Sequence, residues 1–477
     1  MTSNWRRVEA FESQASLSSH TMPSMAFPGV LPSPLRAGVA LLLAAPLFGV
    51  PLVAAPLAAT ASTAAGASTA AAGVVRPAAA ASGVRPVARA VTPKVLTTRW
   101  SSAAELARGQ RKGVAVSGGS LVMAPVPAGS ASLKDPFGTR PAARFDYGTW
   151  VSPWAATGFD ATNLIASWNA RTPAGTYLRI DARTRSASAT SSWDKVAVWG
   201  FTVESTHRHS GDAQADDLNK LLTDTLVSQR GTMRTWQVRV TMYRRTGTTL
   251  TPRVDSLGAV AANFSKRTAR TSPTSMRSTS EMAVPGFSQM IHTGHYPQWD
   301  AGGEAWCSPT STAMVLRHFN RGPKPAHYAW THETDGQVDH AARYTYDHTY
   351  QGAGNWPFNT AYAGMYGTDA FVTRLLNLRD AERFIRAGIP VVVSIAFSRG
   401  GLDGSPLTST PGHLVVITGF AADGRVIVND PAAPRNSTVR RVYRRDQFEG
   451  AWLGGSGGVA YVIHPASKPL PGDSARW

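Results

Sequence analysis

"PGHLVVITGFAADGRVIVNDP", residues 411–431, is the stretch that decides the fold of the C-terminal half of the chain. Two runs of aliphatic and β-branched residues flank a short segment with Asp423 and Gly424, a pattern typical of a β-hairpin. If the loop centres near residues 421 and 422, His413 pairs directly with Asp430, with Cβ atoms about 5 Å apart. A tighter turn shifts the register by an even number of residues, so both side chains still share one face. The hairpin predicts a histidine that is oriented by a carboxylate.

The chain of 477 residues has one cysteine, Cys307, in "AWCSPTSTAMVLRHF", residues 305–319. Ser308 suits a helix N-cap and Pro309 the first helical position, and apolar residues then recur at a spacing of three: Ala313, Leu316 and Phe319. Cys307 is therefore predicted at the N-terminus of a helix, where unpaired N–H groups favour a thiolate nucleophile. The alternative is a small buried hydrophobic side chain.

Residues 283–466 are predicted to form one domain that mixes helices and strands. In "DAERFIRAGIPVVVSIAF", residues 380–397, a helical pattern stops at Gly388 and a continuous β-branched run follows, as in a buried strand. The predicted fold class of this domain is α+β. Residues 266–282 lack a periodic apolar pattern and are predicted to be a linker, and residues 467–477 are predicted to be a tail.

Residues 130–265 read as short strands separated by turn residues, which predicts an all-β sandwich. "TYLRIDARTR" alternates apolar and charged residues, and "WQVRVTMYRR" repeats the alternation. One helical interruption is predicted at "DDLNKLLTDTLVS", residues 216–228. Five tryptophans are candidates for a sugar-stacking platform, although filling the core is the simpler interpretation: Trp150, Trp154, Trp168, Trp193 and Trp199.

Residues 1–60 are predicted to carry a signal peptide, because an apolar run follows Arg36 and leads into small residues. Pro46 and Pro51 interrupt that run, so no stable membrane span is predicted. Residues 61–129 begin as an Ala-, Ser- and Pro-rich segment and are predicted to be a tether. We expect a secreted or cell-wall-associated protein.

The composition and the remaining motifs narrow the function. A single cysteine excludes an intramolecular disulfide and any multi-cysteine metal site. The net charge of +18 comes from scattered residues and no nucleic-acid-binding module is visible, so no nucleic acid partner is predicted. Residues 331–350 are rich in His, Asp and Glu but match no recognised metal-ligand spacing. We therefore predict no metal and no cofactor.

"VPGFSQ", "WCSPTSTAMVL", "GHLVVITGF" and "VIVNDP" resemble, in order and spacing, secreted relatives of the bacteriocin-processing (double-glycine-leader) cysteine peptidases, a papain-like group. The resemblance covers about residues 283–466, and the preceding sandwich resembles domains attached to such peptidases in actinobacteria. It implies a papain-like domain with Cys307 as nucleophile, His413 as general base and Asp430 as its orienting residue. Gln289 of "VPGFSQ" corresponds to the glutamine of the oxyanion hole. Gln298 is the alternative, because Gln289 stands eighteen residues before Cys307, a longer spacing than in papain-like enzymes.

The sequence thus predicts an exported cysteine peptidase that hydrolyses peptide bonds of a peptide or protein substrate through a thioester. The sandwich would bind a cell-wall polymer. Two alternatives remain: a cell-wall amidase or transamidase with the same triad, and a cell-surface binding protein with an inactive peptidase-like domain.

Overall fold

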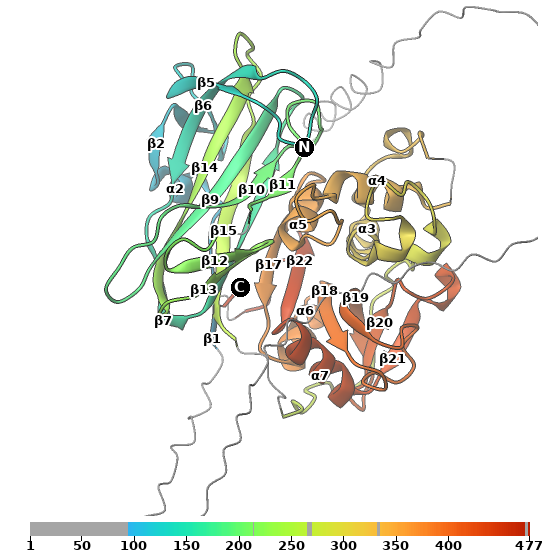
Figure 1. The fold of residues 1–477 in the computed structure, drawn as a ribbon. Coiled ribbons are helices and arrows are strands. Elements are labelled where there is room, and N and C mark those ends of the chain that lie inside the picture. The colour runs from blue at the N-terminus through green and yellow to red at the C-terminus, as the bar shows by residue number, and fades with distance from the viewer. Residues whose placement is uncertain (1–93, 213, 265–269, 332–333, 473–475) are drawn as a thin grey trace, which may run out of the picture. The chain divides into compact units, whose positions relative to one another are not determined.

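The computed structural model describes five stretches of the chain: residues 94–212, 214–264, 270–331, 334–472 and 476–477. These residues form three antiparallel β-sheets and six α-helices, so the fold is mostly β (Figure 1). The predicted signal region, residues 1–60, and the first part of the predicted tether lie outside the described residues.

The N-terminal half is a sandwich of two sheets. One sheet has the order β12-β13-β8-β15-β4-β3, with β1 on β15, and its strands are β1 (Lys94–Trp100), β3 (Val114–Ser117), β4 (Ser120–Met123), β8 (Asn163–Arg171), β12 (Asn219–Leu222), β13 (Thr225–Ser228) and β15 (Arg253–Asn263). The other has the order β11-β10-β9-β14-β6-β2, with β5 on β6 and β7 on β14, and its strands are β2 (Gln110–Lys112), β5 (Gly129–Leu133), β6 (Ala143–Val151), β7 (Ala155–Ala161), β9 (Thr176–Arg185), β10 (Asp194–Trp199), β11 (His209–Ser210) and β14 (Met233–Arg245).

Alternation of side chains builds the core between these sheets. The predicted runs are strands β9 and β14, and their apolar residues are buried: Leu178, Ile180, Ala182, Trp236, Val238, Val240 and Met242. Trp100 of β1 makes edge contacts with Trp150 and Trp236 of the facing sheet, at ring-centroid distances of 5.6 Å. Trp150, Trp168 and Trp199 are fully buried. These three tryptophans therefore fill the core and do not form a sugar-stacking platform.

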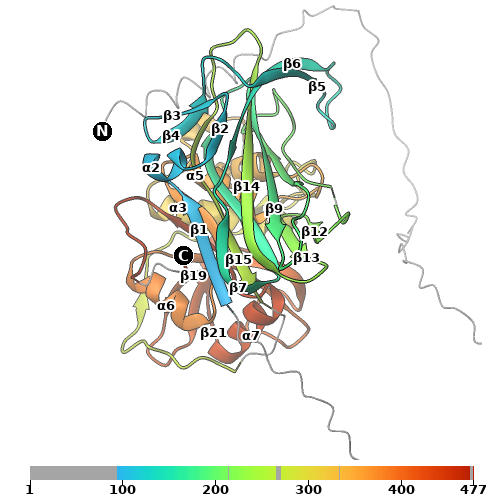
Figure 2. The same cartoon turned by 90° about the vertical axis from the view of Figure 1, so that its left-hand side faces the viewer.

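The sandwich begins earlier than the sequence indicates. Strands β1 to β4 and helix α2 (Ala103–Ala107) lie between residues 94 and 123, so the tether prediction is wrong for that stretch. Strand β1 pairs with β15 over its whole length, and the two strands run side by side in Figure 2. These strands are short, and their apolar residues are too few to reveal a period before the partner strand is known.

The helix predicted over residues 216–228 is wrong. Those residues form the hairpin β12–β13, and β13 pairs with β8. The turn residue Thr223 has a φ of 53°, in the left-handed region that a helix does not use. Leu221 and Leu226 pack into the sandwich core, so cross-strand pairing overrides the helical spacing of the leucines.

The C-terminal half contains one sheet with helices against it. Its strand order is β17-β22-β18-β19-β20-β21, with β16 on β19, and the strands are β16 (Ser280–Glu281), β17 (Asp369–Arg374), β18 (Val391–Phe397), β19 (Thr410–Phe420), β20 (Val426–Asn429), β21 (Arg440–Tyr443) and β22 (Val459–His464). The helices are α3 (Cys307–His318), α4 (Gly336–Thr345), α5 (Trp356–Gly364), α6 (Leu378–Arg386) and α7 (Arg445–Gly455), and four 3₁₀ turns are η1 (Gln289–His292), η2 (Gly303–Ala305), η3 (Pro325–His327) and η4 (Asn436–Thr438). The predicted helix and strand around Gly388 correspond to α6 and β18.

The sandwich covers the edge strand β17 of this C-terminal sheet. Asn169 of β8 donates to the carbonyl of Ala370 at 2.6 Å and accepts from its N–H at 2.9 Å. Ser167 accepts from the N–H of Val372. Because an edge strand carries unpaired N–H and C=O groups, these side chains replace the partner strand that β17 lacks.

The segments predicted to be a linker and a tail also pack. Ser272 hydrogen-bonds through its N–H and hydroxyl to the buried carboxylate of Glu449. Trp477 is buried and its ring lies 5.2 Å from that of Phe384. Both segments therefore contribute to the C-terminal half, although their sequences carry no periodic pattern.

Candidate functional site

Cys307 is the first residue of helix α3. The N-cap is Trp306 and makes no side-chain cap bond, so the prediction that Ser308 caps the helix is wrong by two positions. Ser308 instead lies inside the first turn, where its hydroxyl is 2.9 Å from the hydroxyl of Tyr461. Trp306 is fully buried and its indole N–H donates to the carbonyl of Trp299, which fixes the start of the helix. The Cys307 side chain is half-buried.

His413 and Asp430 form a buried pair. Nε2 of His413 lies 2.7 Å from Oδ1 of Asp430. The same carboxylate accepts from the N–H of Ala432 at 3.1 Å and, through Oδ2, from the hydroxyl of Tyr443 at 2.8 Å. Because Nε2 is occupied by Asp430, Nδ1 is the nitrogen left for another partner.

Electrostatics couples this pair to the thiol. Burial by itself lowers the pKa of His413, but the charge and hydrogen bond of Asp430 and then the interaction with Cys307 raise the pKa of His413 to about 10. Burial acts to raise the pKa of Asp430, but the His413 charge and the bonds from His413, Tyr443 and Ala432 hold it below its usual range. His413 is therefore an imidazolium at neutral pH in this arrangement.

The hairpin pairs in a register that differs from the predicted one. Val416 lies opposite Asn429 and Phe420 opposite Val426, so His413 does not face Asp430 directly, and the ladder partner of His413 is Ile395 of β18. Asp430 follows the last residue of β20. The prediction of a direct pair is wrong, while the prediction of a shared face agrees with the Nε2–Oδ1 contact.

Gln289 lies in η1 and lines the same cavity as Cys307. Its side-chain N–H donates to the carbonyl of Glu304 at 2.6 Å, and its backbone N–H donates to the carbonyl of Pro431. The side-chain oxygen Oε1 is buried and has no hydrogen-bond partner among the described residues. Gln298, the alternative, is exposed. The long insertion between Gln289 and Cys307 therefore folds back, and both residues line one cavity.

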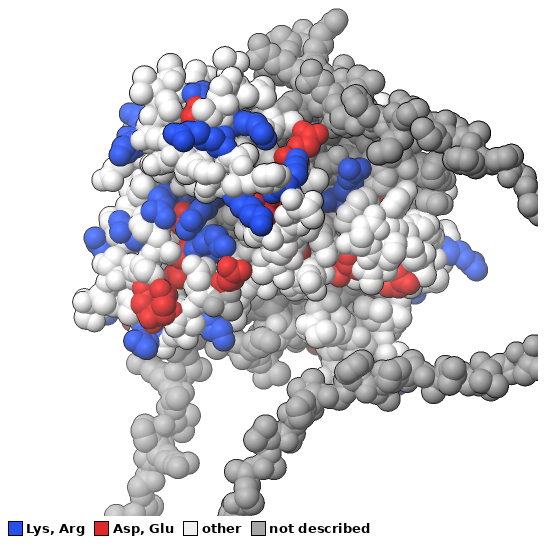
Figure 3. All heavy atoms as spheres, turned by 45° about the horizontal axis from the view of Figure 1, so that its top comes forward, with Lys and Arg blue, Asp and Glu red and all other residues white. Residues whose placement is uncertain are grey.

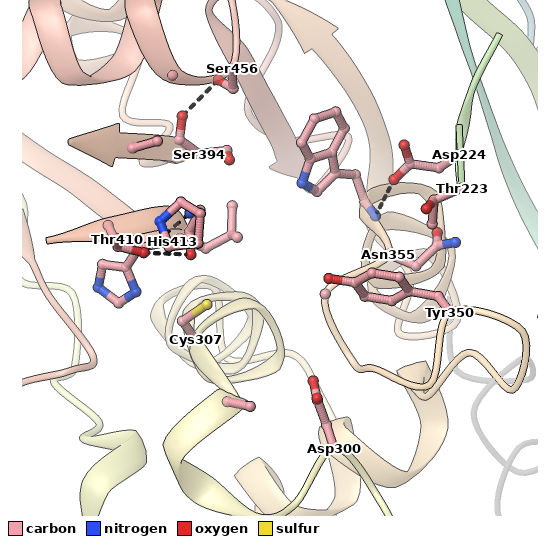
Figure 4. Close-up of a pocket in the computed structure, with 18 of the residues that line it drawn as sticks. Thr223, Asp224, Asp300, Cys307, Tyr350, Asn355, Ser394, Thr410, His413 and Ser456 are labelled. Carbon is pink, nitrogen blue, oxygen red and sulfur yellow. Dashed lines mark hydrogen bonds between the residues drawn. The ribbon is translucent and has the colours of Figure 1, made fainter. Parts of the chain in front are cut away.

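A cavity of about 890 Å³ opens at these residues. One side carries Cys307 and His413, and Figure 4 shows Thr223, Asp224, Tyr350 and Asn355 across from them. The hairpin β12–β13 of the sandwich thus forms part of the wall, with the lining residues Leu222, Thr223, Asp224 and Thr225. Both halves of the chain build the cleft.

Three acidic side chains line the cavity: Asp224, Asp300 and Glu304. Asp224 accepts from the N–H of Trp356 at 3.0 Å and from the hydroxyl of Thr225 at 2.9 Å. Burial nevertheless raises the pKa of Asp224 to about 6, and burial also raises the pKa of Asp300. Sequence reasoning missed Asp224 because it belongs to the other half of the chain, and it missed Tyr443 because nothing local links that residue to Asp430.

The basic residues lie mainly over the sandwich on the face drawn in Figure 3, interleaved with acidic side chains. Trp154 and Trp193 are half-buried, unlike the three core tryptophans. The guanidinium of Arg183 stacks over both rings, at 5.0 and 4.4 Å from their centroids, and that of Arg185 lies 3.7 Å from the ring of Trp154. Two of the five candidate tryptophans thus remain at the surface, next to arginine.

Comparison with known families defines the class of protein. The model of the Peptidase C39 N-terminal domain (Pept_C39_actino_N) matches residues 96–262, and that of the Peptidase_C39 like family matches residues 281–458. The two halves of the chain are thus similar to the two domains of C39-related proteins that carry an N-terminal domain of the actinobacterial type. These two matches confirm the resemblance seen in the sequence, and the match of residues 281–458 supports a function of the cysteine peptidase type.

Similarity to individual proteins is weak. No curated protein matches closely enough to count as a relative. One similar solved structure comes from work on the promiscuous specificity of carbohydrate-binding modules of the β-sandwich superfamily: 12% identity, 31% of this chain and 54% of that chain covered, TM-score 0.17. A TM-score this low carries no argument. In the part of the chain that the structure describes, no helix is long and apolar enough to span a membrane.

Proposed function

We propose that the protein is an exported cysteine peptidase with a papain-like α+β domain. Cys307 is the nucleophile, His413 the acid and base, and Asp430 the residue that orients His413. The observation that carries the proposal is the row from thiol to imidazole to carboxylate, which opens on a cleft large enough for a peptide.

The raised pKa of His413 supports an imidazolium beside the sulfur of Cys307. We propose the thiolate as the attacking form of Cys307, because the thiolate and not the thiol is the nucleophile. The Cys307 thiolate attacks the carbonyl carbon of the substrate, and the electrons of the C=O bond move to the oxygen. The tetrahedral intermediate collapses, the C–N bond breaks, and imidazolium His413 gives its proton to the leaving amine. A water then attacks the thioester, neutral His413 takes its proton, and the acid leaves as the thiolate returns.

Two donors are available for the oxyanion. The N–H of Cys307, as the first helical residue, has no intrahelical acceptor. The Gln289 amide uses one N–H for Glu304 and retains a second. We propose that these two groups stabilise the oxyanion. A positioned donor of this kind contributes about 3 to 4 kcal/mol.

A peptide carrying a thiol-reactive electrophile tests this function. We expect rapid labelling of wild-type protein at Cys307 and a large loss of labelling rate in His413→Ala. For turnover of peptide substrates, Gln289→Ala should lower kcat by about 10²- to 10³-fold, whereas Gln298→Ala, the matched exposed glutamine, should leave it unchanged. Labelling that is no faster than that of a free thiol, and indifferent to His413→Ala, rules out the peptidase and favours a binding protein.

The amidase or transamidase alternative uses the same groups, so only the substrate separates it. Purified protein is incubated with unmodified peptides and, in parallel, with peptides released from cell wall, with and without an added amine. Hydrolysis restricted to the cell-wall peptides favours an amidase. Transfer to the added amine favours a transamidase.

A further inference from the structure

The insertion between Gln289 and Cys307 carries two histidines next to a carboxylate of helix α4. His292 ends η1, His295 lies three residues later, and Asp339 is in the first turn of α4. Nδ1 of His292 lies 3.0 Å from Oδ2 of Asp339, and Nδ1 of His295 lies 3.3 Å from Oδ1. One potential ligand atom from each residue falls within 4.8 Å of the others.

The hydrogen bonds of His292 and Asp339 do not satisfy all of their buried polar atoms. His292 and Asp339 are fully buried. Among the residues that the structure describes, neither ring nitrogen of His292 nor Oδ2 of Asp339 has a hydrogen-bond partner, although Nδ1 and Oδ2 are only 3.0 Å apart. Their directions therefore do not suit a bond between them. Nδ1 of His295 lies 3.3 Å from the other carboxylate oxygen, Oδ1. Buried polar atoms without a partner are costly, so the two nitrogens of His292 and Oδ2 of Asp339 call for an explanation such as a bound ion.

The chemistry and spacing of the three residues suit a cation. Imidazole and carboxylate together are ligands for divalent first-row transition metals, with zinc the usual occupant of tetrahedral sites. Ligands at about 2.0 to 2.1 Å from zinc lie about 3.3 Å apart at tetrahedral angles, which is close to the 3.0 and 3.3 Å seen here. The ring planes of His292 and His295 are perpendicular, with centroids 5.3 Å apart, so the rings reach the carboxylate from different sides.

We propose that His292, His295 and Asp339 bind one divalent transition-metal ion, zinc in the first instance, which fastens the insertion to helix α4. The site is separate from the Cys307 cleft, since none of its three residues lines that cavity. The sequence predicts no metal, because residues 331–350 match no recognised metal-ligand spacing. Local spacing cannot reveal a set of ligands drawn from two segments 44 residues apart.

The position of the site gives the ion a structural role. Gln289 and His292 are the two ends of η1, and the ring of His292 lies 6.1 Å from that of Trp306, the residue before Cys307. Gly303 packs so closely on this turn that a Cβ there would come within 2.4 Å of the Gln289 carbonyl oxygen. An ion on His292 therefore holds the turn that carries Gln289, and through Trp306 the start of α3.

The test is metal content, measured in the Cys307→Ala background so that zinc on the thiol and His413 does not contribute. Protein without a histidine tag is grown in zinc-supplemented medium, and its bound metals are counted by mass spectrometry. We expect about one ion per chain and an X-ray absorption shell of nitrogen and oxygen at about 2.0 Å without sulfur. Removal by a chelator should lower the Tm by several degrees, and added zinc chloride should restore it.

Asp339→Asn and His292→Gln should each lose the metal and the zinc-dependent change in Tm. His318→Gln, a half-exposed histidine outside the cluster, should retain both. A protein that purifies without stoichiometric metal and shows no zinc-dependent Tm overturns the proposal, as does equal metal content in the ligand variants. If both variants fail to fold, the measurements on the Cys307→Ala protein decide alone.

Discussion

His413 and Asp430 share a face of the C-terminal sheet because the hairpin that joins them contains one irregularity. Beside the turn, paired residue numbers sum to 846, as in Phe420 with Val426, and this register would place the two side chains on opposite faces. Between Ile417 and Gly419 the register shifts, and the sum becomes 845. The residue numbers of His413 and Asp430 sum to 843, two less than the sum of 845 in this register. Because an even difference preserves the face, both side chains lie on the same face of the sheet. The irregularity at Thr418 thus brings the pair together.

Removal of the imidazole should expose an ordinary thiol. Because the pKa of His413 is about 10, imidazolium His413 accompanies Cys307 across the neutral range. Alkylation of wild-type Cys307 by iodoacetamide should therefore stay fast at pH 6. In His413→Ala the rate should fall there and rise toward pH 8.5, the ordinary pKa of cysteine. His318→Ala is the control, and identical pH profiles for wild type and His413→Ala would contradict the prediction.

The same pair should shape stability at high pH. The pKa of His413 is higher in the folded protein than the ordinary value of 6.5, so its stabilisation is complete below about pH 6.5 and is lost as the pH rises through 10. Thermal denaturation from pH 6 to 10 should show a falling Tm for wild type. The fall should be smaller for His413→Gln, and an equal fall in both proteins would refute the assignment.

Much of this site is predictable from local sequence, and the rest depends on distant contacts. The helix start at Cys307 and the hairpin with His413 and Asp430 are each encoded within about twenty residues. The irregularity at Thr418 and the bond from the Tyr443 hydroxyl to Asp430 depend on the exact register in which β19, β20 and β21 pair. The hairpin tip at Asp224 comes from the other half of the chain. Periodicity carries no information about such contacts.

Asp224 should destabilise the protein when it is ionised. Burial raises the pKa of Asp224 to about 6, from an ordinary value near 3.9, so the folded state bears an unfavourable charge above pH 6 that disappears below pH 4. Asp224→Asn should therefore raise the free energy of unfolding at pH 8 by about 2 to 3 kcal/mol, with a higher Tm, and leave both unchanged at pH 4. Asp216→Asn alters an exposed residue close to the same hairpin and should leave the Tm unchanged at pH 8 and at pH 4. A lower Tm for Asp224→Asn at pH 8 would oppose this account.

Leu222 should contribute to substrate binding without affecting the chemistry. Its side chain is 48% exposed and lines the cavity from the sandwich side. Leu222→Ser should raise KM for peptide substrates by about 3- to 10-fold through lost apolar contact, with kcat and the iodoacetamide rate unchanged. Leu250 is 45% exposed elsewhere in the sandwich, so Leu250→Ser is a matched control. An equal effect of the two substitutions on KM would show that Leu222 does not contribute to substrate binding.

Asn169 should stabilise the contact between the sandwich and the C-terminal sheet. Asn169→Ala leaves the N–H and the carbonyl of Ala370 buried and unpaired, at about 1 to 3 kcal/mol for each group. Urea unfolding followed by tryptophan fluorescence should show a loss on the order of 2 to 4 kcal/mol. The side chain of Asn263 makes one exposed hydrogen bond, to Asp160, so Asn263→Ala should cost less than about 1 kcal/mol. A small loss in both variants would mean that the edge of β17 does not need this cover.

The surface tryptophans Trp154 and Trp193 are the expected binding surface for an anionic cell-wall polymer. Trp154 and Trp193 offer aromatic faces, and Arg183 stacks over both while Arg239 stacks over Trp193, so the patch combines stacking with positive charge. The full chain with Trp154→Ala and Trp193→Ala should lose retention on isolated cell wall severalfold, and wild-type retention should weaken as salt is raised. Phe137→Ala removes an exposed aromatic ring elsewhere in the sandwich and should leave retention intact. Equal retention of all three proteins would exclude this patch as the binding surface, and salt-independent retention would exclude the contribution of its arginines.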